Sequence, residues 1–364
     1  MRTSIVTATE ALADMVGDYL TGTCTSIGTT AGVALIDARL KDKSRNTDDY
    51  YNDQCVWITA GTSVAGDERY ISDFTATSGT VTPYQAFTAQ VPSASTYMIF
   101  KLWTATEYRN ALNTALGDAY PWVSRNFVDE TLDTVADTWS YRLGDYGTGA
   151  AVTYTTVSCT DTGKAWQTNQ FAGMTVISGA SVGVIASNTA TVATVASWTN
   201  ATPSSASQYQ IIHPITEVQN VSYQQDDTVT TRPYVDVPFE VYDHEGIKIV
   251  QLLQYPPVGK VLRIVGRGKL TPFTSTVTST TEIGGREIKL VYYLAAFHLF
   301  NRTPSLSASQ DRDFYLERAQ WFYSEYERER EQKKTPRMPK RVWRTGMGMS
   351  SGDDATYLAA NDTP

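Results

Sequence analysis

Residues 91–99 read VPSASTYMI, and a related segment, TPSSASQYQI, lies at residues 202–211. Each follows, in the same order, a strand-like segment (residues 53–61 and 169–179), a Gly turn, an Ile-containing turn and a Thr/Val-rich strand. Each copy spans about 50–60 residues, enough for a small β-barrel or sandwich of about five strands. Because several elements keep their order, we predict a duplicated β-module. Two convergent Ser/Thr-rich β-segments are the alternative.

The two modules interrupt a different unit. Outside them, apolar periodicity predicts helices at residues 104–125, 284–301 and 309–333, and alternation predicts strands at 127–143 and 215–270. The predicted fold class is α+β: a helical bundle plus an antiparallel β core, with two small inserted β-barrel or sandwich modules. The predicted boundaries are an N-terminal helix (1–22), a first β-module (23–103), a first core segment of helix and strands (104–150), a second β-module (151–213), a second core segment of strands and two helices (214–333) and an extended basic C-terminal arm (334–364).

The composition is typical of a folded, β-rich chain with little chemistry. Of the 364 residues, 41% are hydrophobic and 19% are charged, which excludes wholesale disorder. The sequence has no apolar run long enough to predict a membrane-spanning helix. Its first residues lack the uninterrupted apolar stretch that is typical of a secretory signal. The three cysteines are widely spaced and odd in number, so we expect reduced thiols, no disulfide framework, no zinc site and no cofactor.

Few residues could carry catalysis, so we expect no enzymatic activity. The sequence has no Gly-x-Ser-x-Gly elbow. Its three histidines are better explained as structural: His213 before a proline, His244 in a hairpin turn and His298 on an apolar helix. Paired carboxylates fall in loop or tail sequence, at Asp48-Asp49, Asp226-Asp227 and Asp353-Asp354. A glycan hydrolase that used Asp226 or Asp227 is the enzymatic alternative.

Charge is unevenly distributed along the chain. The net charge is −8, but residues 328–344 hold eight basic and two acidic residues, a local charge of +6 that leaves −14 for the remainder. A basic segment on an acidic body predicts an arm that binds an acidic surface of a protein or nucleic acid, with a solvated tail as the alternative. The candidate arm residues are Arg337, Lys340, Arg341, Trp343 and Arg344.

The two C-terminal helices carry a further signal. Residues 288–300 are apolar nearly all round, which is typical of a helix that is buried or lies in an interface. The following helix shows an aromatic stripe. The candidates for helix packing or a subunit interface are Tyr292, Tyr293, Phe297, Phe314, Trp321 and Phe322.

Seven short motifs occur outside the β-modules, and they point to one family. They are EYRNALNTAL (107–116), AYP (119–121), DETL (129–132), WSYRL (139–143), ITEV (215–218), GKVLRI (259–264) and VYYLAA (291–296). In this order they resemble the head-to-tail connector (adaptor or neck) proteins of tailed bacteriophages. The β-modules are also similar to small modules that recur in phage structural proteins, but the smallest connectors lack such insertions.

The resemblance implies a structural virion protein of the phage neck, assembled in the host cytoplasm. Connectors of this family form a ring, commonly of twelve subunits, whose helices face the portal protein and whose C-terminal segments reach into it. Their β-parts face a tail, nozzle or terminator protein. DNA passes through the channel without specific binding, and an acidic body suits such passage. No membrane contact is implied.

A second structural role stays open at this point. The chain could instead be a tail-tip or baseplate protein whose β-modules bind receptors or sugars. In that case exposed Trp57, Trp166 and Trp198 would serve as ligand platforms.

Overall fold

The computed structural model describes residues 2–225, 234–285, 287–302 and 309–332. It is mostly β-sheet: strands make up 35% and helices 21%, with five sheets and five helices in these ranges. The predicted α+β class, a helical bundle plus a β core, is therefore wrong. Four of the helices form one small group. The Thr-, Val- and Tyr-rich sequence elsewhere forms sheets. No helix in the described ranges is both long and apolar enough to cross a membrane.

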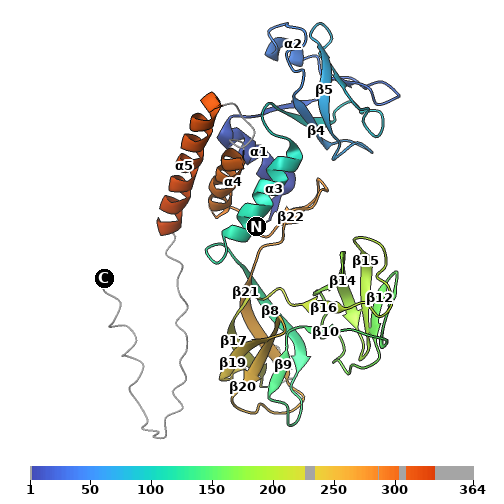
Figure 1. The fold of residues 1–364 in the computed structure, drawn as a ribbon, viewed down its shortest axis with the longest axis vertical. Helices are drawn as coiled ribbons and strands as arrows, with labels where there is room; N and C mark the ends of the chain where they lie inside the picture. Colours follow the sequence, from blue (N-terminus) through green and yellow to red (C-terminus); the bar gives the residue numbers. More distant parts are fainter. Residues whose placement is uncertain (1, 226–233, 286, 303–308, 333–364) are drawn as a thin grey trace.

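The first β-module is a six-stranded antiparallel sheet with its own core (Figure 1). The spatial order is β2-β7-β4-β5-β6-β3, and buried Val56, Ile58, Ile71 and Ile99 belong to its core. The short helix α2 (Leu40–Lys43) follows β3. The strands are β2 (Leu20–Thr23), β3 (Leu35–Ile36), β4 (Cys55–Ala60), β5 (Glu68–Thr75), β6 (Thr80–Pro83) and β7 (Thr96–Phe100).

The second β-module is a seven-stranded antiparallel sheet built in the same way. Its order is β10-β16-β13-β14-β15-β12-β11. Apart from the added edge strand β11, each strand takes the same place in the spatial order as its counterpart in the first module. The strands are β10 (Asp145–Gly147), β11 (Val152–Thr155), β12 (Ser158–Asp161), β13 (Thr175–Ser178), β14 (Ser181–Asn188), β15 (Val192–Trp198) and β16 (Tyr209–Ile212).

A buried tyrosine–aspartate pair lies at the same place in both modules. The Tyr97 hydroxyl donates to the Asp37 carboxylate at 2.7 Å, and the Tyr209 hydroxyl donates to Asp161 at 2.9 Å. A glycine pairs with each tyrosine across the neighbouring strand: Gly22 faces Tyr97 and Gly147 faces Tyr209. A Cβ at the glycine would overlap the tyrosine ring in both modules.

Backbone hydrogen bonds define the register between the two copies. The Asp53 amide donates to the Ile71 carbonyl, and the Gly173 amide donates to the Ile185 carbonyl. Asp53 therefore corresponds to Gly173, and not to Asn169, with which the sequence comparison begins. The sequence-based alignment is four residues out of register at this point. Asn169 resembles Asp53 in residue type, but it corresponds to Asp49, which shares its left-handed φ of about 60°.

A β-sandwich lies beside the second module, at the bottom of Figure 1. Its two sheets have the orders β18-β17-β21-β8 and β19-β20-β9, and they share one core that includes Leu132, Tyr141, Val221, Val250 and Leu262. The strands are β8 (Arg125–Asp133), β9 (Ser140–Arg142), β17 (Glu217–Gln224), β18 (Tyr234–Asp236), β19 (Phe239–His244), β20 (Ile247–Leu252) and β21 (Val261–Gly268). A separate pair joins β1 (Thr3–Ser4) to β22 (Thr280–Thr281).

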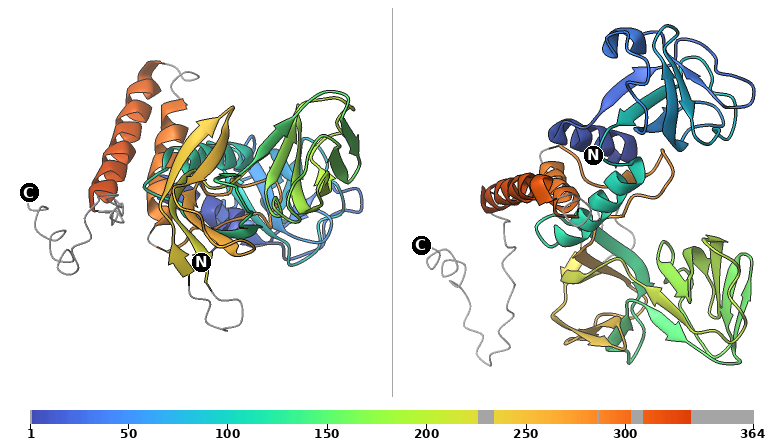
Figure 2. Two further views of the ribbon diagram at one scale, coloured as in Figure 1. Left: turned by 90° about the horizontal axis from the view of Figure 1, so that it is seen from below. Right: turned by 45° about the horizontal axis from the view of Figure 1, so that its top comes forward.

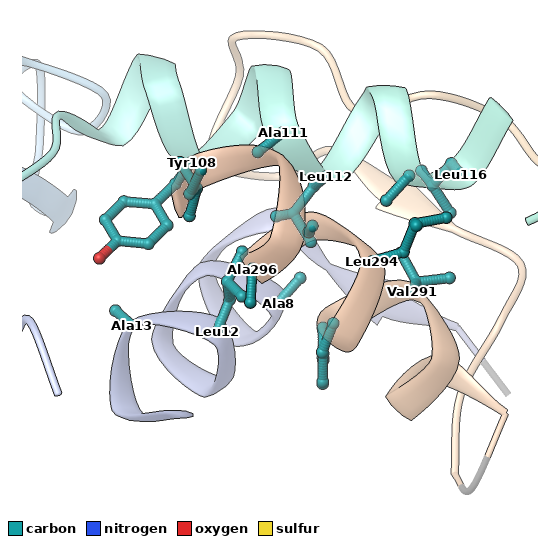
Figure 3. Packing of buried hydrophobic residues seen from close by; sticks show 14 of the residues in the cluster. Ala8, Leu12, Ala13, Tyr108, Ala111, Leu112, Leu116, Val291, Leu294 and Ala296 are labelled. Atoms are coloured by element: carbon teal, nitrogen blue, oxygen red, sulfur yellow. The ribbon is translucent and has the colours of Figure 1, made fainter. Parts of the chain in front are cut away.

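Four helices pack together between the first module and the sandwich (Figures 1 and 2). They are α1 (Ile5–Val16), α3 (Ala105–Asp118), α4 (Ile288–Arg302) and α5 (Ser309–Gln332). Helix α4 contacts the other three. Figure 3 shows Leu12 of α1, Leu112 of α3 and Ala296 of α4 pointing toward one another, and all three are fully buried. Small alanines let these helices approach closely. Because three other helices pack against α4, it is apolar on nearly every side.

Side-chain caps fix where two of these helices begin. Ser4 accepts a hydrogen bond from the Thr7 amide at the start of α1. Thr104 and Glu107 form a reciprocal capping box at the start of α3. Helix α1 ends at Gly17, whose φ of 75° is a left-handed conformation that favours glycine.

Asp18 ties α1 to the first module and to α3. Its carboxylate accepts hydrogen bonds from the amides of Lys101, Leu102 and Trp103, at 2.7, 2.8 and 3.2 Å, and from the Tyr108 hydroxyl at 2.9 Å. The residue is 1% exposed. Burial raises the pKa of the Asp18 carboxyl, and these four hydrogen bonds oppose that rise.

Candidate interaction surface on the C-terminal helices

The six aromatic residues predicted for helix packing or a subunit interface fall into two groups in the structure. Tyr292 and Phe322 belong to the helical core, with 7% and 0% of their surface exposed. The Phe322 ring stacks on Phe300 at 5.5 Å between ring centroids. Tyr293 and Phe297 lie at the edge of the same core. Phe322 and Phe297 make ring contacts between α4 and α5, with Phe300 and Tyr323 respectively.

Phe314 and Trp321 point outward from α5. They are 61% and 46% exposed, and their spacing of seven residues places them on one face, two turns apart. The Arg318 guanidinium lies 5.1 Å from the Trp321 ring centroid and 5.3 Å from that of Phe322. We call Phe314 and Trp321 the outer aromatic pair. Large exposed aromatic side chains with an adjacent arginine are typical of interface hot spots.

A second group of exposed aromatic residues lies on the other edge of α5. Tyr323 is 38% exposed and packs on Phe297 at 5.1 Å. Trp122, 39% exposed, lies beyond the end of α3, and the Arg330 guanidinium is 5.5 Å from its ring. Sequence reasoning missed Trp122 and Tyr323. The aromatic run WFYSEY (321–326) was the available signal for Tyr323, because residues so closely spaced cannot all face one helix side.

The predicted arm residues cannot be placed on this surface. Arg337, Lys340, Arg341, Trp343 and Arg344 lie outside the described residues. The described segment of α5 ends at Gln332, so the outer aromatic pair lies on the helix that leads directly into the basic segment.

Each of the three histidines lies near a carboxylate. The Ile215 amide donates to Nδ1 of His213, so Nε2 carries the proton and donates to Asp129 at 2.9 Å. His244 is exposed at its hairpin turn, and His298 lies 3.1 Å from Asp118. Within the described ranges, no group of three or more His, Cys, Asp or Glu residues could hold a metal ion.

The cysteines are buried thiols with no sign of activation. Cys24, Cys55 and Cys159 are each free and almost fully buried. Burial raises the pKa of the Cys24 and Cys159 thiols to about 12, and raises that of Cys55 as well. A nucleophilic cysteine needs a lowered pKa, so these residues are unsuited to that role.

The proposed ligand platforms are not available at the surface. Trp57, Trp166 and Trp198 are 5%, 8% and 9% exposed, so the hypothesis that these indoles bind a ligand is wrong. Asp226 and Asp227 lie outside the described residues. In the Asp48-Asp49 pair, Asp48 accepts from the Ala76 amide at 2.7 Å and serves as a loop cap.

Comparisons with family models, with curated proteins and with solved structures find no match for this chain.

Proposed function

We propose that this chain is a structural virion protein, the head-to-tail connector of a tailed phage, and not an enzyme. It would form a ring, of about twelve copies by the family resemblance, between the portal protein and a tail, nozzle or terminator protein. The observation that carries the proposal is the outer aromatic pair on α5, exposed on the helix that precedes the basic segment. It supplies an exposed aromatic surface of the kind that association covers.

The chemistry of the chain supports an assembly role. Its histidines and cysteines are committed to structural contacts or lack an activating neighbour, as described above. The charge of −14 outside residues 328–344 favours free passage of DNA, because a channel lined with basic residues would hold phosphates strongly. The +6 segment suits docking on an acidic portal surface.

Ring formation imposes a condition on the outer aromatic pair. A ring is built from head-to-tail contacts, so the pair must meet a different surface of the neighbouring copy. Burying two such aromatic anchors contributes about 2 kcal/mol or more to each contact. Removal of both should therefore prevent or strongly weaken ring closure while leaving the subunit folded.

The first test is the oligomeric state of the purified full-length protein by mass photometry. We expect a species near twelve times the chain mass of 40.1 kDa for the wild type, and monomers for the Phe314→Ala/Trp321→Ala double variant. Tyr242→Ala is the matched control, since Tyr242 is 42% exposed on β19. Rings that form equally well in the double variant would exclude the α5 surface as the contact.

The second test locates the protein and its arm. Gold-labelled antibody should mark the neck of the virion, and a chain truncated after Lys333 should stay folded but fail to join purified portal rings. A distal tail location would instead support the tail-tip or baseplate role. Unchanged portal binding by the truncated chain would overturn the role of the arm.

A further inference from the structure

An open groove of about 650 Å³ lies where the first module meets α3. Strand β5 contributes Glu68, Arg69 and Tyr70, the segment after β6 contributes Tyr84 and Gln85, and Asp53 and Thr106 complete the lining. Figure 1 shows β5 in the module above α3. The volume lies within the range of about 300–1,000 Å³ that is typical of small-ligand sites.

Two exposed tyrosine rings line the groove. Tyr70 is 53% exposed and Tyr84 is 65% exposed, and neither belongs to the core of the first module. The Tyr84 amide donates to the Tyr70 carbonyl at 2.9 Å, so the backbone holds the two residues side by side. Tyr70 lies on β5, an interior strand of the sheet, and Tyr84 directly follows β6, so both exposed rings present apolar surface to solvent from hydrogen-bonded backbone.

Oriented acceptors surround these rings. The Asp53 carboxylate accepts from the Tyr84 hydroxyl at 3.0 Å. The Glu68 carboxylate accepts from the Thr106 hydroxyl at 2.6 Å and from the Thr106 amide at 3.2 Å. Among the residues that the structure describes, neither carboxylate forms an ion pair with a lysine or arginine.

Arg69, the one cation among the residues that line the groove, is already engaged, and Nη2 of neighbouring Arg109 donates to the Thr106 hydroxyl at 3.5 Å. Nε of Arg69 donates to the Ala86 carbonyl at 3.0 Å, and Nη1 donates to the Glu68 carbonyl at 2.8 Å. Nη2 lies 3.8 Å from the Asp67 carboxylate. The groove thus offers negative charge, acceptors and aromatic faces, which disfavours an anionic ligand such as nucleic acid or an acidic sugar.

We propose that this groove binds a neutral glycan, a short oligosaccharide of hexose or N-acetylhexosamine units. The C–H faces of a pyranose ring pack on tyrosine rings, and its hydroxyls donate to carboxylates. Asp53 and Glu68 already accept hydrogen bonds from hydroxyl groups, those of Tyr84 and Thr106, and sugars supply the same donor. The Gln85 amide adds both a donor and an acceptor.

Glycan binding is separate from ring assembly. The groove uses residues of the first module and the start of α3, and none of the outer aromatic pair on α5. A monomeric variant should therefore still bind glycan, and a groove variant should still form rings. Failure of one proposal leaves the other standing.

The test uses the full-length protein on an array of neutral oligosaccharides, with titration calorimetry on the ligands that bind. We expect Tyr70→Ala and Tyr84→Ala each to raise the Kd at least tenfold. Tyr84→Phe, which keeps the ring and removes the hydrogen bond to Asp53, should raise it only two- to threefold. Tyr242→Ala, an exposed tyrosine on β19 outside the groove, should leave Kd unchanged.

Three controls accompany the binding test: one for folding and two for ligand class. Circular dichroism of each variant establishes that it is folded, and a heparin hexasaccharide and an Arg/Lys hexapeptide serve as anionic and cationic probes. The proposal is overturned if no neutral glycan on the array binds, or if folded Tyr70 and Tyr84 variants bind as tightly as the wild type. It is also overturned if only the heparin or the basic peptide binds in the groove.

Discussion

Replacing Asp18 should weaken the contact between the first module and the helices and so lower the free energy of unfolding. The carboxylate accepts four hydrogen bonds, three from consecutive backbone amides and one from Tyr108, in a site that is 1% exposed. A hydrogen bond to a charged group contributes about 1.5–3 kcal/mol, and a buried donor left without a partner costs about 1–3 kcal/mol. Since the four bonds share one acceptor and are not additive, we expect Asp18→Ala to lower the free energy of unfolding by about 4 kcal/mol.

Asp18→Asn provides an intermediate case. It keeps the shape and one acceptor oxygen, but its amide group brings hydrogen atoms toward the backbone donors, so we expect a loss of about 2–3 kcal/mol. Urea unfolding followed by circular dichroism at 222 nm measures the helical unit directly. Asp14→Asn is the matched control, because Asp14 is exposed on α1, four residues before Asp18, and should change stability by less than about 0.5 kcal/mol. The reasoning fails if both Asp18 variants unfold within about 0.5 kcal/mol of the wild type.

Three further predictions test the other units of the fold. Burial acts to raise the pKa of the Asp129 carboxyl, but its hydrogen bonds hold that pKa below the usual value, so the charged form adds stability above about pH 4 that is lost as pH falls. Asp129→Asn should therefore be less stable than the wild type at pH 7, with the gap narrowing toward pH 3 in urea titrations, and a gap independent of pH would contradict this. Gly22→Ala should destabilise the first module by about 1–3 kcal/mol in thermal unfolding, because the added methyl overlaps the Tyr97 ring, and an unchanged midpoint would show that the ring can shift. Phe322→Ala should cost about 3–5 kcal/mol and make α5 sensitive to limited proteolysis, while exposed Phe314→Ala should not, and equal cleavage of the two variants would count against this packing.

Local signals predicted several helix positions, because caps and apolar spacing act over a few residues. The sequence predicts a helix at residues 104–125, and α3 begins directly after the Thr104 cap but ends at Asp118. The predicted N-terminal helix of residues 1–22 is shorter in the structure, since it ends at Gly17, which takes a left-handed conformation. Helix ends are weakly specified by sequence because the last turn depends on tertiary contacts such as those of Asp18.

Long-range arrangement was harder to predict. Alternation along a strand shows that two faces differ, but not which face another element covers. The tryptophans expected at the surface are instead core residues: the Nε1 group of Trp166 donates to buried Asp145 at 2.7 Å, and that of Trp198 donates to the Thr155 carbonyl. The fold class was wrong for a related reason, since the local pattern of each strand does not show that strands, at 35%, outweigh helices, at 21%, and assemble into five sheets.

Surface roles depend on details that sequence does not show. Phe314 and Phe322 were both candidates for helix packing or a subunit interface, yet one is 61% exposed and the other is fully buried. Residues eight apart on a helix point about 80° from each other, and which of the two directions faces α4 depends on tertiary packing. The Tyr70–Tyr84 groove arises in the same way, from a strand pairing that brings separate segments together.

Both β-modules begin and end on neighbouring strands. In the first, Leu20 of β2 pairs with Ile99 of β7, and in the second, Asp145 of β10 pairs with Ile211 of β16. The chain therefore leaves each module next to the point where it entered. Recombination that removed, duplicated or replaced such a unit would need to rejoin only two adjacent chain ends, and to refit the few side chains that contact its neighbours, such as Trp57 against the helices and Gln170 against the sandwich. A change in the ligand preference of the groove could then be acquired by exchanging the first module as one unit, since that module supplies most of the lining residues.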